Sequence, residues 1–153
     1  MKPADKRQIK SATRLYLVQA LFQMEASDSD VETVTEEFLT HRFGAQEEEH
    51  DWLEGNANFF ERLLTAAVSN QAKVDQHTDQ ALVEKWPLKR IDPTLRALFR
   101  AAGAELVSEP TPPKVVISEY VDVAKAFFPD GREPKFVNAV LDHMARALQP
   151  QNF

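Results

Sequence analysis

The sequence predicts an all-α protein of about seven helices arranged in two packed helical bundles. Apolar residues recur at intervals of three and four along most of the 153 residues, which is the period of a helix with one buried face. Prolines, glycines and N-capping residues separate these segments by short connections, as in helical bundles. The one β-branched run, PKVVISEYV, continues into a helical pattern and is therefore also predicted to be helix.

The first two helices are predicted from their apolar faces and caps. The first helix extends from about Asp5 to Ala26 and has an apolar face formed by Ile9, Tyr16, Leu17, Ala20 and Met24. Ser29 and Glu32 have the spacing of a capping box and predict the start of a second helix, which should end near Gly44.

The middle of the chain predicts a third helix from about Asp51, with Trp52, Phe59, Leu63 and Leu64 on its apolar face. Near Ser69 the pattern allows either a break or a continuation into the segment with Val74 and Leu82. Pro87 should end this part of the chain.

Proline marks the last three helices. Asp92-Pro93 is a capping residue followed by a first-turn proline and predicts a helix through Leu106. PTPP at 110–113 is a stiff linker, and the helix after it should end at the Pro-Asp-Gly turn of 129–131. Pro134 fits the first turn of a final helix, and 149–153 is expected to be a loose tail.

The whole chain, 1–153, is predicted to be a single domain, with an N-terminal bundle at about 5–85 and a C-terminal bundle at about 86–148. Its length suits one domain, and 43% hydrophobic residues are enough for a sizeable core. No apolar run approaches the roughly 18 to 20 residues of a membrane span, and no signal peptide is evident. The expected location is therefore the cytoplasm, without membrane contact.

The charge is distributed in three zones that the overall net charge of −6 conceals. Residues 1–24 hold five Lys or Arg against one Asp, a net +4. Residues 25–54 hold eleven Asp or Glu against one Arg, a net −10, and 55–153 are balanced. Separated charges of this kind indicate partners and not a fold.

Several classes of chemistry find no support in the sequence. There is no cysteine, and the four histidines form no i, i+4 pair, so no thiol chemistry and no metal site is predicted. None of the four glycines belongs to a phosphate-binding loop, and no nucleophile elbow is present. The acidic run at 47–51 fits a solvated helix start better than a metal site. We therefore expect no enzymatic activity and no cofactor.

The basic N-terminus is the most informative functional signal. Arg7, Lys10 and Arg14 are spaced i, i+3, i+7 and align along one side of the first helix, beside its apolar face. Such a row can follow a phosphate backbone while the helix stays docked. The charge pattern alone equally allows solubilising charges or ion pairs with the acidic second helix.

Two long segments carry a resemblance to a known family. They are LKRIDPTLRALFRAAGAEL and PPKVVISEYVDVAKAFFPDGREPKFVNAVLD, and Arg14 with VQALF falls in the matching register near the N-terminus. Together these segments resemble the NusB family of bacterial transcription antitermination factors. The resemblance is weakest between Ala26 and Trp86.

The resemblance implies an all-helical fold of two bundles and no enzymatic activity. It implies that the protein pairs with the ribosomal protein NusE and that the pair binds the single-stranded boxA element of nascent ribosomal RNA. NusA, NusG and RNA polymerase would complete the larger complex. Carried over by position, it assigns phosphate contacts to Lys2, Lys6, Arg7, Lys10 and Arg14.

Four further residues are candidates for RNA contact, and three of them have a structural alternative. Phe136 could stack on a base beside a phosphate contact from Lys135, or belong to the core with Val137 and Val140. Asn138 could bond to RNA or to the backbone. Phe22 could stack on a base near the basic row, or pack against the second helix.

Four charged residues lie within otherwise apolar helices: Arg100, Glu105, Glu119 and Lys125. They could form a partner surface, but ion pairs that lock helices together are the favoured interpretation, because a half-buried charge is costly unless it is paired.

Two other functions compete with antitermination. One is an RNA-targeting module related to the N-terminal domain of ribosomal RNA cytosine methyltransferases, which would need a catalytic domain with a cysteine, and this sequence has none. The other is a protein-only helical scaffold in which the basic row meets an acidic partner. The free protein is expected to be a monomer or a homodimer, and the sequence does not decide between them.

Overall fold

The computed structural model describes residues 5–44, 46–47, 50–51, 54–82 and 91–153, and the all-α prediction is confirmed in them. The seven α-helices are α1 (Lys6–Ser27), α2 (Val31–Glu37), α3 (Ala57–Ser69), α4 (Gln71–Ala81), α5 (Pro93–Ser108), α6 (Pro113–Phe127) and α7 (Glu133–Leu148). A π-helical turn, Phe38–Arg42, follows α2, and a 3-10 turn, Pro150–Asn152, follows α7.

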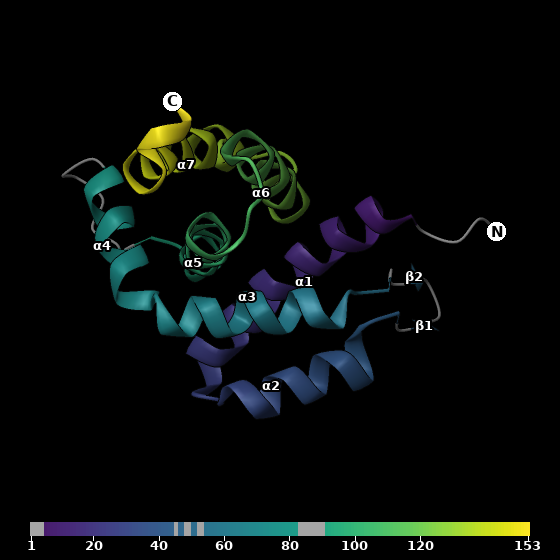
Figure 1. Ribbon diagram of the computed structural model, residues 1–153. Coiled ribbons are helices and arrows are strands. Elements are labelled where there is room, and N and C mark those ends of the chain that lie inside the picture. The colour runs from purple at the N-terminus through teal and green to yellow at the C-terminus, as the bar shows by residue number, and fades with distance from the viewer. Residues whose placement is uncertain (1–4, 45, 48–49, 52–53, 83–90) are drawn as a thin grey trace.

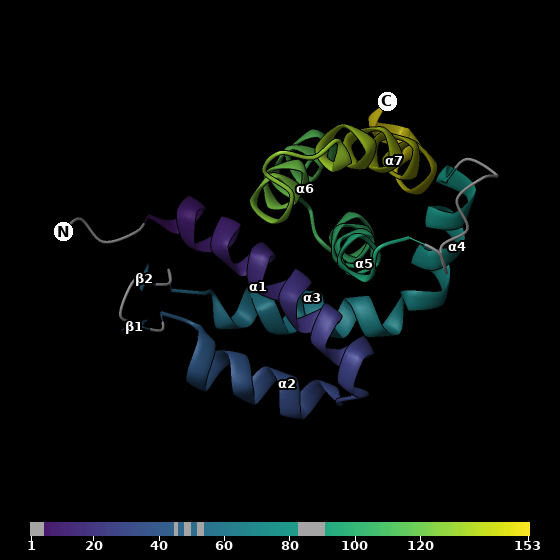
Figure 2. The same ribbon diagram turned by 180° about the vertical axis from the view of Figure 1, so that it is seen from behind.

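Helix α5 lies at the centre of the molecule (Figures 1 and 2). It packs against α1 and α3 on one side, against α6 and α7 on the other, and against α4. Helix α2 covers α1 and α3, and α6 lies between α7 and the first turns of α1. The central position explains why α5 is buried along most of its length, from Leu95 to Leu106.

Capping residues explain where the helices begin. Asp5 accepts a hydrogen bond from the backbone N–H of Gln8, whose side chain accepts one from the N–H of Asp5, a complete capping box for α1. Asn56 caps α3 and Asp92 caps α5, the latter followed by a first-turn proline as predicted.

Two local predictions differ from the structure. The cap of α2 is Asp30 and not Ser29, because the Asp30 carboxylate accepts the hydrogen bond from the N–H of Thr33. The third helix begins at Ala57 and not near Asp51. Before it, the two-residue strands β1 (Gln46–Glu47) and β2 (His50–Asp51) pair in antiparallel register. Trp52, predicted on that helix, lies outside the described residues.

The structure resolves the alternatives near Ser69 and corrects the prediction of a loose C-terminal tail. Helices α3 and α4 are separate, because Asn70 leaves helical geometry at φ −109° and ψ 11°. The tail after α7 is held to the protein: the Gln149 side chain donates a hydrogen bond to the carbonyl of Leu106 in α5, and the Arg146 guanidinium lies over the ring of Phe153. The predicted division between bundles, at residues 85 and 86, falls outside the described residues.

We searched the described helices for a membrane span. None of them combines the length and the apolar character that crossing a bilayer requires.

Candidate nucleic-acid interface

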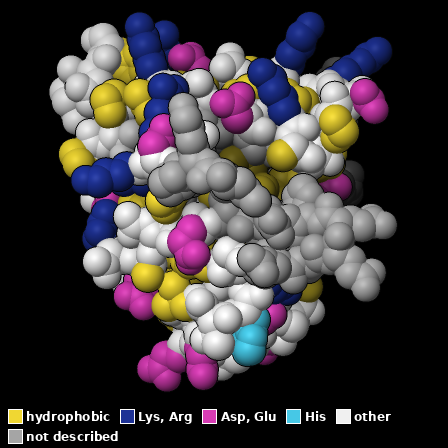
Figure 3. Space-filling view, turned by 90° about the vertical axis from the view of Figure 1, so that its right-hand side faces the viewer, with side chains coloured by type: hydrophobic (Ala, Val, Ile, Leu, Met, Phe, Trp, Pro, Cys, Tyr) yellow, Lys and Arg dark blue, Asp and Glu magenta, His cyan; other side chains and the backbone are white. Residues whose placement is uncertain are grey.

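Lys6, Arg7 and Lys10 form an exposed row on the first turns of α1, which we call the basic row. Within the described part of the chain, no carboxylate forms an ion pair with any of the three. Figure 3 shows the end of the molecule where α1 begins, and most Lys and Arg side chains visible there lie in its upper half, on the side of α6 and α7. Lys2 lies outside the described residues.

Arg14 does not belong to this exposed row, and the expectation that it does is wrong. Its side chain is buried, with only 4% of the residue exposed. Its Nε and Nη2 donate to the two carboxylate oxygens of Glu105 at 2.9 and 2.8 Å. Its Nη1 lies 3.3 Å from Oε1 of Glu119. A guanidinium occupied on three nitrogens by carboxylates of the same chain is not available to a phosphate.

Two hydroxyl groups complete the site around Arg14. Ser11 donates to both oxygens of Glu119, at 3.1 and 2.9 Å, and the Tyr120 hydroxyl donates to Oε1 of Glu105 at 3.2 Å. We call these five residues, from α1, α5 and α6, the Arg14 cluster. They include one cation and two carboxylates, and both Glu105 and Tyr120 are fully buried.

The pKa values of the Arg14 cluster follow from burial and pairing. Burial alone would lower the pKa of Arg14, but the hydrogen bonds and charge of Glu105 outweigh it, so this pKa is raised. Burial raises the pKa of Tyr120 well above its ordinary value, and the negative charge of Glu105 adds to the effect. The cluster therefore holds a charged arginine and a neutral tyrosine.

Phe22 is exposed, at 40%, but it does not lie beside the basic row. It is twelve residues after Lys10 on the same helix, which corresponds to about 18 Å along the axis. There it lines a groove of about 440 Å³ together with Val18, Phe38 and Phe127. Phe22 is therefore distant from the basic row, although the sequence predicted it to lie near these cations.

The three candidates on α7 share one helix but differ in exposure. Lys135 and Asn138 are exposed, whereas Phe136 is partly buried, with its ring edge-on to Phe99 at 6.1 Å between centroids. Phe136 therefore has the core contact that the sequence offered as its alternative. Helix α6 lies between this part of α7 and α1.

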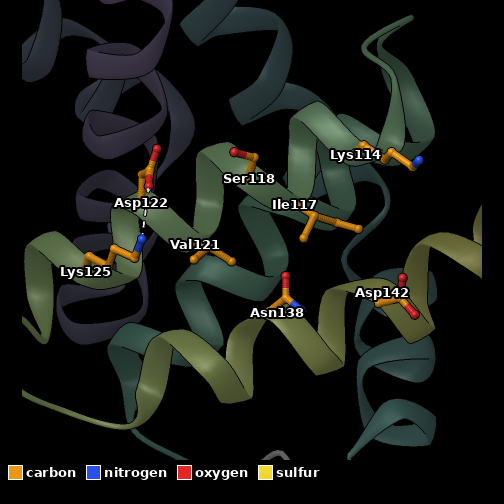
Figure 4. A pocket seen from close by; sticks show the side chains of 8 residues that line it. All are labelled: Lys114, Ile117, Ser118, Val121, Asp122, Lys125, Asn138 and Asp142. Atoms are coloured by element: carbon orange, nitrogen blue, oxygen red, sulfur yellow. Dashed lines mark ion pairs between the residues drawn. The ribbon is translucent and has the colours of Figure 1, made fainter.

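Asn138 faces a shallow groove between α6 and α7, of about 360 Å³. Figure 4 shows its amide projecting from α7 toward the α6 side chains Ile117 and Val121, which line the same groove. Lys125 lines the same groove and forms a 3.8 Å ion pair with Asp122. The lining of the groove combines apolar side chains with amide, hydroxyl, ammonium and carboxylate groups.

Ion pairs between helices were predicted for the charged residues inside apolar segments, and three of the four form them. Arg100 pairs with Asp75 of α4 at 2.8 Å, and Glu105 and Glu119 both pair with Arg14. Among the described residues, Lys125 pairs with Asp122 of its own helix α6 and with no residue of another helix. The sequence did not indicate that Arg14 is the common partner of Glu105 and Glu119, since Glu105 is 91 residues away from it along the chain.

No described group of three or more His, Asp or Glu side chains is arranged to hold a metal ion.

Comparison with known proteins identifies the family. The NusB family model matches residues 11–146, most of the chain. The chain belongs to the NusB family. Transcription antitermination protein NusB of Maricaulis maris (strain MCS10) is 44% identical over 153 residues, covering 99% of this chain and 95% of that protein. NusB of Mesorhizobium japonicum is 43% identical, covering 97% and 94%.

Solved NusB structures share the fold. NusB of T. maritima superimposes with a TM-score of 0.71 at 30% identity, over 95% of this chain and 93% of that one. A chain from the crystal structure of antitermination factors NusB and NusE in complex with double-stranded RNA gives a TM-score of 0.73 over 90% and 96%. That chain is 20% identical, so the likeness shows the NusB fold alone.

Proposed function

We propose that this protein is a transcription antitermination factor that binds RNA together with NusE. The pair would bind the single-stranded boxA element of nascent ribosomal RNA and assemble on RNA polymerase with NusA and NusG. Membership of the NusB family over residues 11–146 supports this proposal most directly. We infer a binding function without catalysis.

The basic row supplies the proposed RNA contacts. Lys6, Arg7 and Lys10 are exposed on consecutive turns, and no described carboxylate neutralises them. Cations in such a row neutralise successive phosphates and release counterions, which lowers the affinity steeply as salt rises. The family resemblance makes Lys2 a further proposed phosphate contact.

Helix α7 supplies a second proposed set of contacts. Lys135 is exposed and offers an ammonium group to a phosphate, and Asn138 offers an amide to a base edge or a sugar. Phe136, between them, is partly exposed beside Phe99 and offers part of its ring to a base. Discrimination between RNA sequences would be shared with NusE.

The test is a titration of fluorescent boxA-like RNA, and of a scrambled RNA, with this protein alone and with NusE at several salt concentrations. We expect weak, salt-dependent binding alone and tighter, boxA-selective binding with NusE. Equal affinity for both RNAs in the presence of NusE would contradict the proposal. Binding to NusE with no affinity for RNA would favour a protein-only scaffold.

A further inference from the structure

The Arg14 cluster joins α1 to α5, at the centre of the fold, about one helical turn after the basic row. We propose that this cluster positions the basic row for RNA and makes no RNA contact itself. Ser11, Arg14, Glu105 and Glu119 are then positioning residues. The inference rests on the proposed function, because it assigns a role within that interface.

The bidentate pair with Glu105 fixes the rotation of α1. Two parallel N–H···O bonds, 2.9 and 2.8 Å long, hold the plane of the guanidinium against a carboxylate that is fully buried in α5. Forked pairs of this kind restrict direction as well as distance. Turning α1 about its axis would break both bonds at once.

Glu119 fixes α1 at a second point. Its carboxylate accepts hydrogen bonds from Ser11 and lies 3.3 Å from Nη1 of Arg14, so it holds two consecutive turns of α1 against α6. Ser11 directly follows Lys10, the last residue of the basic row. Two attachments at different points along the axis of α1 fix the direction of that axis and so the direction of its first turns.

A shared aromatic ring connects the cluster to the basic row. The ring of Phe59, a buried residue of α3, has Arg14 Cζ 5.3 Å and Lys10 Nζ 5.1 Å from its centroid. Cations at this distance are attracted to the face of the ring. Lys10 and the buried guanidinium therefore contact the same ring, over which Arg62 also lies at 5.7 Å.

The proposal predicts an effect opposite in sign to that of simple electrostatics. The cluster contains two carboxylates and one guanidinium. Removing a carboxylate makes the protein less negative, which by charge alone strengthens binding to RNA. If the carboxylate positions the basic row, its removal weakens binding instead.

The experiment compares Glu119→Gln with Glu36→Gln in the full-length chain bound to NusE, using fluorescent boxA-like RNA at fixed salt. Glu36 is exposed on α2, a helix that contributes no residue to the cluster, so its substitution removes the same charge outside the cluster. We expect Glu119→Gln to weaken binding several-fold and Glu36→Gln to leave it equal or tighter. Binding by Glu119→Gln that is as tight as that of Glu36→Gln would overturn the proposal.

Ser11→Ala gives a second test that leaves the charge unchanged. It removes the hydrogen bonds from Ser11 to Glu119 and retains the buried ion pair, so the variant should fold even if Glu119→Gln does not. We expect weaker RNA binding in the same direction as Glu119→Gln. An unchanged affinity for Ser11→Ala would count against positioning through Glu119.

Amide hydrogen exchange without RNA separates this inference from the proposed function. The amides of the first turns of α1 should exchange faster in Glu119→Gln and at the original rate in Glu36→Gln. If the original protein binds no RNA, the proposed function fails while this comparison still tests the anchoring of α1. If it binds RNA and exchange is the same in both variants, the positioning role alone fails.

Discussion

At the scale of single residues, the side chain of Arg14 joins α1 to α5 and α6. A lysine there would carry the same charge, but its single ammonium group could not hold Glu105 with two parallel bonds and Glu119 with a third nitrogen. Because the pair of Arg14 and Glu105 is buried, removing Arg14 should lower the stability of the fold. Loss of the cation would leave two carboxylates, one of them fully buried, without a positive charge beside them.

We predict that Arg14→Met destabilises the protein by about 3–5 kcal/mol, the cost of breaking a buried pair by removing one partner. Urea unfolding followed by circular dichroism measures it. Arg7→Met is the matched control, because Arg7 is exposed on the same helix and its loss should change stability by less than about 0.5 kcal/mol. Equal stability of the two variants would contradict the burial of Arg14.

Tyr120 should make the protein sensitive to alkaline pH. Burial, and then the charge of Glu105, raises its pKa well above the ordinary value of 10.0. A group whose pKa is raised by folding gives stability that is complete below pH 10.0 and is lost as pH rises through the folded-state value. The free energy of unfolding should therefore fall above about pH 10, because the unfolded chain then loses a proton that the folded protein keeps.

Urea unfolding between about pH 8 and about pH 11 tests this prediction against Tyr120→Phe. The phenylalanine variant lacks the hydroxyl, so its stability should start lower and decline less over the alkaline range. Both proteins share all their lysines, which removes lysine titration from the comparison. Parallel curves would show that Tyr120 contributes nothing to the decline.

At the scale of helices, the cap of α1 controls the turn that displays the basic row. Asp5 closes a capping box with Gln8 directly before Lys6. Losing such a cap costs about 1 kcal/mol and lets the first turn fray. Since α1 begins within the proposed interface, fraying should affect RNA binding before it affects the fold.

We predict that Asp5→Ala and Asp5→Asn separate capping from charge. Both remove one negative charge, but asparagine keeps a side-chain oxygen for the N–H of Gln8 and caps helices about as well as aspartate. RNA titration with NusE should give equal or tighter binding for Asp5→Asn and weaker binding for Asp5→Ala. Identical affinities would mean that the order of the first turn is irrelevant to binding.

Close contact between α4 and α5 depends on Gly103. A Cβ added at this position would lie 2.4 Å from Cγ1 of the buried Val74. Gly103→Ala gains about 1 kcal/mol of helix propensity but forces this contact apart, and overpacking costs about 1–3 kcal/mol. We expect net destabilisation in thermal unfolding. In the double variant with Val74→Ala the two losses should not add, because the smaller side chain makes room for the new methyl group.

At the scale of the whole molecule, the sequence predicts the helices better than the connecting segment between α2 and α3. Periodicity, caps and prolines place α1, α5, α6 and α7 close to their observed bounds. Side chains cap α1 and α5, and a proline lies in the first turn of α5, α6 and α7. The region from 44 to 57 is predicted poorly. There β1 and β2 pair over only two residues each, which is too short for any alternation of side chains to be detected.

The exposure of the basic residues on α1 was predicted only in part, because periodicity does not show which other helices cover α1. The spacing of Arg7, Lys10 and Arg14 gives their direction around α1 but not the width of the arc that other helices cover. Because both α5 and α6 pack against α1, the arc of α1 that they cover includes Arg14 and excludes Lys10. The partner of Arg14, Glu105, is remote in sequence and could not be recognised from the spacing. Family resemblance supplied the function, which periodicity could not.

The most direct test of the account is the salt dependence of RNA binding in two matched double variants. Lys6→Ala with Arg7→Ala removes two cations of the basic row, and Lys73→Ala with Arg146→Ala removes two exposed cations from α4 and α7. With NusE and boxA-like RNA, each lost phosphate contact lowers the slope of log affinity against log salt by about 0.7. The account predicts a slope reduced by about 1.4 for the first variant and unchanged for the second. Equal slopes in the two variants would contradict it.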